Sequence, residues 1–235
     1  MISRIDERLR ALAEVILCSS VPTQLAIGGV LALLGWQATE AGGGLSFRYV
    51  FVLSIVDTIL LIGLMVALTR AHGERPSKLW LGDRPVFREA LHGLLMAPLI
   101  LFGVGLLLNA LRLFAPWLHN VPTNPLEQMA SSPGQAAALA LVAILAGGVR
   151  EELQRAFLLQ RFERHLGGPE IGVIVLSIAF GLGHYPQGWD AVIATGVMGA
   201  VWAGMYLRRR SSVAPVVSHA AFNSIEILRV AMVGG

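Results

Sequence analysis

The segment 136–149 reads AAALALVAILAGGV, and it runs without a break into REELQR, residues 150–155. A helix that crosses a bilayer needs roughly 20 mostly apolar residues, and the helical pattern here continues to about Leu166. Charged side chains at membrane depth are costly and point to functional sites. The stretch therefore predicts a membrane helix that carries a group of chemically active residues.

The rest of the chain has the composition of a membrane protein. Apolar residues make up 55% of its 235 residues and charged residues only 14%, whereas soluble domains carry about 25% charged residues. The mean hydropathy is +0.66. We expect an all-α fold, a polytopic transmembrane helical bundle of about seven spans, in a single membrane domain over residues 1–235. The predicted spans are about Ala11–Trp36, Tyr49–Leu68, Ala90–Leu111, Ala136–Leu166, Ile171–His184, Asp190–Leu207 and Val213–Val233.

Basic residues alternate between the predicted loops. They precede the first span and fill every second loop, while Gln37–Ser46, Leu113–Gln135 and Tyr185–Trp189 carry none. By the positive-inside rule, this pattern predicts a cytoplasmic N-terminus and a protein that lies in the plasma (inner) membrane. The expected partner is therefore membrane lipid, and the pattern argues against nucleic acid as a partner. The single cysteine, Cys18, excludes a disulfide framework. The basic residues are Arg4, Arg8, Arg10, Arg70, Arg75, Lys78, Arg84, Arg88, Arg161, Arg164, Arg208, Arg209 and Arg210.

Two adjacent acids follow the apolar segment. Glu151 and Glu152 cannot both be ionised cheaply at membrane depth unless one is paired or protonated. Arg155 lies at helical spacing from either carboxylate. Such an arrangement is typical of a general base. The alternative is that these charges lie at the cytosolic end of the helix and simply reach water.

Two imidazoles and an amide occur on later spans. His184 follows Phe180 by one turn at the end of the fifth span, and His219 shares a helix face with Asn223 four residues later. Buried imidazoles and amides need hydrogen-bond partners. An interfacial position for His184, or helix–helix hydrogen bonds for the other pair, would also explain them.

In this order on three predicted spans, the motifs resemble the CAAX-protease and bacteriocin-processing family of intramembrane proteases (CPBP), over about residues 147–223. That family places its arginine five residues after the first glutamate, whereas Arg155 is four after Glu151. Which glutamate is the base therefore stays open, and we favour Glu151. The resemblance implies a catalytic core at about 136–233. The candidate catalytic residues are Glu151, Glu152, Arg155, His184, His219 and Asn223.

The resemblance implies an endopeptidase of the CAAX type that acts on a peptide or a membrane protein. Glu151, with His184, would activate a water, and His219 and Asn223 would stabilise the oxyanion, at about 2.7–4 kcal/mol for each donor. Arg155 would orient the carboxylates. No cofactor is required by this scheme. Zinc stays an open alternative, with Glu151, His184 and His219 as the three protein ligands typical of catalytic sites.

Two other functions remain open. The chain could be a non-catalytic scaffold or immunity protein of the same fold. A small proton-coupled transporter is less favoured, because the sequence shows no inverted repeat. A straight helix from Pro169 would also carry His184 about 22 Å from the inner face at 1.5 Å per residue, deeper than Glu151. The site then forms only if this helix starts outside the hydrocarbon, tilts, or bends at Gly181 and Gly183.

The remaining polar and aromatic residues are assigned lesser roles. Asp57 has no partner that the sequence identifies, and Glu226 lies one turn beyond Asn223, where it could support the site. Tryptophans near span ends are predicted to be interfacial anchors; they are Trp36, Trp117, Trp189 and Trp202. The histidines outside the motifs are expected to be ordinary loop or span-end residues; they are His72, His92, His119 and His165.

Overall fold

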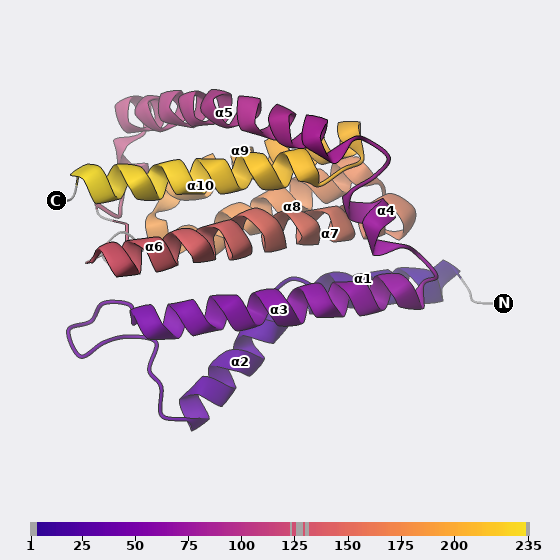
Figure 1. Ribbon diagram of the computed structural model, residues 1–235, viewed down its shortest axis with the longest axis horizontal. Coiled ribbons are helices and arrows are strands. Elements are labelled where there is room, and N and C mark those ends of the chain that lie inside the picture. The colour runs from indigo at the N-terminus through magenta and orange to yellow at the C-terminus, as the bar shows by residue number, and fades with distance from the viewer. Residues whose placement is uncertain (1–3, 123, 126–128, 130–131, 234–235) are drawn as a thin grey trace.

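The computed structural model describes residues 4–122, 124–125, 129 and 132–233, which are mostly helical (Figure 1). The predicted all-α fold is confirmed. The α-helices are α1 (Arg4–Leu17), α2 (Val21–Leu33), α3 (Phe47–Ala71), α4 (Pro76–Trp80), α5 (Val86–Phe114), α6 (Pro133–Val142), α7 (Glu151–His165), α8 (Pro169–Gly183), α9 (Trp189–Arg209) and α10 (Val213–Val233). Short 3₁₀ turns occupy η1 (Pro116–Leu118) and η4 (Tyr185–Gln187), and a π-helix, η3, covers Ala143–Arg150.

The central element is the long helix formed by α6, η3 and α7 in direct succession. Figure 1 shows it between α3 on one side and α10 on the other, with α5 beyond α10 and α8 and α9 behind. Element contacts agree, because η3 packs against both α3 and α10. A β-carbon on Gly148 would lie 2.7 Å from that of Ala220, so the glycine allows η3 and α10 to approach closely.

Three of the described helices are long and apolar enough to cross a membrane by themselves, namely α3, α5 and α9. The pair α1–α2 makes a fourth span if its 42° bend is one broken crossing. The helix α8 is apolar but has only 15 residues, and α7 carries charged side chains on most of its turns. The chain is an integral membrane protein, and the number of seven spans stays a prediction.

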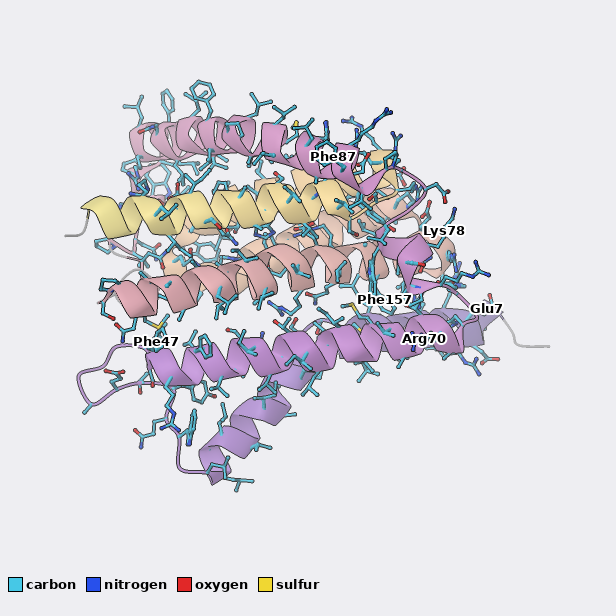
Figure 2. The ribbon with its side chains drawn as sticks, in the orientation of Figure 1. Glu7, Phe47, Arg70, Lys78, Phe87 and Phe157 are labelled. Carbon is cyan, nitrogen blue, oxygen red and sulfur yellow. The ribbon has the colours of Figure 1, made fainter. Side chains whose placement is uncertain are left out.

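The basic loops gather at one end of the bundle. Arg70 and Lys78 lie at this end in Figure 2, and Phe47 lies at the opposite end of α3. Ion pairs join the loops there, with Arg161 Nε 2.5 Å from Glu14 Oε2 and Arg209 Nε 2.5 Å from Glu89 Oε2. The loops that carry the basic residues in the sequence therefore lie at one end of the molecule.

One of these ion pairs predicts a small pH effect. Glu163, in the last turns of α7, accepts hydrogen bonds from Arg210 at 2.6 and 2.7 Å, and this contact lowers the pKa of Glu163 below its usual value of 4.5. A lowered pKa stabilises the fold above the unfolded pKa, and this stability disappears as the pH falls through the folded value. Because the pair is partly exposed, we expect Glu163→Gln to cost about 1 kcal/mol or less at pH 7. Melting curves of both proteins should converge below about pH 4; a constant difference at lower pH would contradict this.

Candidate active site

A cavity of about 680 Å³ lies among η3, α5, α8, α9 and α10. The structure places four of the predicted site residues on its wall: Glu151, His184, His219 and Asn223. Glu152 and Arg155 do not line it. They lie behind His219, almost fully buried, with 2% and 5% of their surfaces exposed. Residues of all three motifs therefore meet at this cavity: four line its wall, and Glu152 and Arg155 lie behind them.

The depth of His184 does not require a bend in α8. Glu152 lies 13 residues before the end of α7, and His184 follows the first residue of α8 by 15. At 1.5 Å per residue these are about 20 and 22 Å, and α7 and α8 are successive, packed helices joined by a short turn. Glu152 and His184 are thus at similar depth. The helix α8 continues to Gly183, and Gly181 packs against the α9 backbone, so no break in α8 is needed to bring His184 to the depth of Glu152.

Glu152 holds His219 in place from inside the protein. Its carboxylate accepts hydrogen bonds from Arg155 Nε at 3.0 Å and Nη2 at 3.2 Å. The same carboxylate lies 2.9 Å from His219 Nδ1, so a proton on Nδ1 is donated to Glu152. His219 Nε2 then faces the other way, 3.9 Å from Glu151 Oε2. Arg155 therefore orients Glu152 alone, and not both carboxylates as predicted.

A different arginine holds Glu151. Arg150 Nη2 donates to Glu151 Oε1 at 3.1 Å, and the side chain of Glu151 remains 20% exposed on the cavity wall. The sequence analysis predicts no role for Arg150. Its position nevertheless indicates one, because an arginine next to two acids inside an apolar run must itself find a buried partner.

The ring of His219 is fixed by aromatic packing. The indole of Trp202 stacks on it with 3.8 Å between centroids and 14° between planes. Trp202 is fully buried, so its prediction as an interfacial anchor is wrong, and no sequence signal marked this contact. Phe180 packs edge-on against His184, with 4.8 Å between centroids, and Arg155 lies over its face. Aromatic contacts of this kind hold both imidazoles at defined angles.

Asn223 lies close to the π-helix. Its Nδ2 donates to the carbonyl of Ala143 at 3.4 Å, and a β-carbon on Gly147 would collide with the same amide. The π-helix ends with a bond from the Glu151 amide to the carbonyl of Ala146. Single π turns inside α-helices are frequent at functional sites. Here the π turn and Gly147 give the Asn223 amide room beside His219.

Further ionisable residues line the outer part of the cavity. His119 Nδ1 lies 2.8 Å from Asp190 Oδ2, so His119 is not the ordinary loop residue that was expected. Glu226 also lines the cavity, and it pairs with Arg229 at 3.0 Å. These residues make the cavity polar toward the end of α10.

The described side chains offer no group of three or more histidine, cysteine, aspartate or glutamate residues that could hold a metal ion. The predicted ligand set of Glu151, His184 and His219 shares the cavity wall but does not form such a group. His219 Nδ1 faces Glu152, which leaves Nε2 on the side of Glu151. The expectation that no cofactor is required stays a prediction.

The cavity of this integral membrane protein thus carries an acid, two imidazoles and an amide, which are groups that can take part in hydrolysis. Residues 133–225 match the family model described as type II CAAX prenyl endopeptidase Rce1-like. This similarity agrees with the predicted CPBP resemblance and supports a protease in general terms. No curated protein and no solved structure matches the chain.

Proposed function

We propose that the chain is an intramembrane endopeptidase in which Glu151 activates the attacking water. The observation that carries the proposal is the shared cavity wall of Glu151, His184, His219 and Asn223. The family match over residues 133–225 supports it independently. Water held among these polar side chains can be positioned for attack on a peptide bond.

In this mechanism Glu151 removes a proton from water as the water oxygen attacks the carbonyl carbon of the substrate. His184, held through Nδ1 near the Phe180 carbonyl at 2.8 Å, orients the same water with its other nitrogen. The negative oxygen that develops accepts hydrogen bonds from His219 Nε2, when protonated, and from the Asn223 amide. The C–N bond then breaks, and the leaving nitrogen takes the proton that Glu151 had accepted.

The substrate in this proposal is a peptide or membrane-protein segment, and the family match favours a C-terminal CAAX-type peptide. We place the basic end of the bundle, with the N-terminal end of α1, on the cytoplasmic side of the plasma (inner) membrane. No step requires a metal.

Glu151→Gln tests the proposal. The purified variant in liposomes is expected to cleave a fluorogenic prenylated CAAX peptide with kcat lower by at least about 100-fold, because a general base contributes about 10²–10⁴. Glu89→Gln is the control for the loss of a carboxylate that pairs with an arginine, since Glu89 pairs with Arg209 at the basic end and does not line the cavity. Wild-type turnover by Glu151→Gln would exclude Glu151 as the base. Full biological activity of a variant with both Glu151 and Glu152 changed to Gln would favour the non-catalytic scaffold.

A further inference from the structure

Asp57 is an almost completely buried acid in the middle of α3, with 1% of its surface exposed. Its carboxylate accepts hydrogen bonds from Thr23 Oγ1, from Gln24 Nε2 at 3.2 Å and from Arg150 Nη1 at 2.8 Å. An acid at such depth is costly unless its charge is paired and its oxygens are hydrogen-bonded. Here both conditions are met by residues of α2 and η3.

Arg150 links this acid to the cavity. Its Nη1 contacts Asp57 and Ser20 Oγ, the latter at 2.7 Å, while its Nη2 contacts Glu151. Its Nε points to the carbonyl of Ala146 at 3.4 Å. Each nitrogen of the guanidinium therefore has a partner, and the planar group can turn away from Glu151 only by breaking other bonds.

The break between α1 and α2 provides part of this arrangement. Ser20 has a φ of 70°, a left-handed conformation that is unfavourable for a residue other than glycine. Its hydroxyl contacts Arg150, and Gln154 Nε2 lies 3.2 Å from it and 2.6 Å from the Cys18 carbonyl. Backbone strain of this kind persists where the surroundings impose it, often at functional sites.

We propose that Asp57 and Arg150 form a positioning pair for Glu151, in which Asp57 precedes the family match and Arg150 lies within it. This inference rests on the proposed role of Glu151. Two carboxylates share one guanidinium, so Asp57 limits how fully Arg150 neutralises Glu151. At the same time, Asp57 fixes the guanidinium in the place from which it orients the Glu151 carboxylate toward the cavity.

The kinetic test uses Asp57→Asn, which keeps the shape of the side chain and removes its charge. We expect kcat to fall at least about 10-fold while KM changes by less than about twofold, because the substrate still binds but the base is misplaced. Glu89→Gln controls for the loss of a buried ion pair and should keep kcat within about twofold of the wild type. A folded Asp57→Asn protein with unchanged kcat would overturn the inference.

A second readout does not depend on turnover. Carbodiimide labelling of Glu151, followed by mass spectrometry, reports how freely the reagent reaches a carboxyl that is held by Arg150. We expect faster labelling in Arg150→Gln, which leaves Glu151 without its cation, and slower labelling in Asp57→Asn, which leaves the cation to Glu151 alone. Any other pattern in the folded variants overturns the inference. If Glu151→Gln cleaves the peptide normally, the proposed function fails. The labelling pattern still tests whether Asp57 and Arg150 position the Glu151 carboxylate.

If Asp57→Asn does not fold, Thr23→Val tests the inference in its place. This near-isosteric change removes the hydroxyl that contacts Asp57 and the Ser20 carbonyl, and leaves both of those residues in place. A fall in kcat of at least about threefold with unchanged KM supports the inference, and an unchanged kcat overturns it.

Discussion

Replacing Glu152 with alanine is expected to destabilise the protein by about 3–5 kcal/mol and to abolish peptide cleavage. The carboxylate pairs with Arg155, and neither side chain reaches water to any extent. Removing one member of a buried ion pair leaves the other charge without a partner, which is the reason for the large cost. His219 Nδ1 also loses its acceptor, so the ring loses its fixed orientation.

The double replacement Glu152→Leu with Arg155→Leu separates the two effects. Apolar residues in place of a complete buried ion pair are often neutral for stability, so we expect most of the lost stability to return. Activity should stay absent, because His219 still has no acceptor. Thermal melting in detergent measures the first effect, with a shift of roughly 2–4 °C per kcal/mol at this chain length, and peptide cleavage measures the second. Recovery of cleavage in the double variant would contradict the role assigned to Glu152.

Gly148→Ala is expected to cost about 1–3 kcal/mol and to lower cleavage strongly, because it overpacks a tight interface. The added methyl group would lie 2.7 Å from the β-carbon of Ala220 and 3.0 Å from its α-carbon. Backbone atoms cannot turn aside as a flexible side chain does, so α10 must move away from η3. Ala220 follows His219 directly, and the displacement carries the imidazole away from Glu151 and Glu152.

Gly103→Ala is the matched control. Gly103 lies within α5, and a β-carbon there would have no neighbour within 4 Å. Alanine is favoured over glycine in a helix by about 1 kcal/mol, so this variant should melt at or above the wild-type temperature and cleave normally. Equal melting temperatures for Gly148→Ala and the wild type would show that the interface is not tight at that position.

The sequence predicts the fold class and the grouping of the motifs better than their contacts. Composition alone indicates a helical membrane protein, and the spacing of His219 and Asn223 correctly places both on one helix face toward the cavity. The spacing of Arg155 allows either carboxylate, and only the packing of α7 against α10 directs it to Glu152. Helical periodicity defines a face but does not define which of two neighbours on that face is contacted.

Contacts between distant segments were not predictable in the same way. The partner of Asp57 is 93 positions away in the chain, and its pairing depends on how α3 lies against η3. Trp202 stacks on His219 because α9 and α10 pack together, whereas its position near a predicted span end suggested the membrane interface. The depth of His184 relative to Glu152 depends on how α7 and α8 pack side by side, which helical spacing alone does not define.

The size of the cavity has a consequence for what can be cut. A volume of about 680 Å³ is that of a site for a small molecule, typically about 300–1,000 Å³, so it admits a few residues of chain and no folded domain. A polypeptide in lipid stays helical because its backbone has no other hydrogen-bond partner there. Under the proposed function, a target must therefore fray locally before its scissile bond can enter, and chain ends, which are the least tied down, do so most easily. Substrates would then be selected first by how easily their helix unwinds, and only afterwards by their side chains.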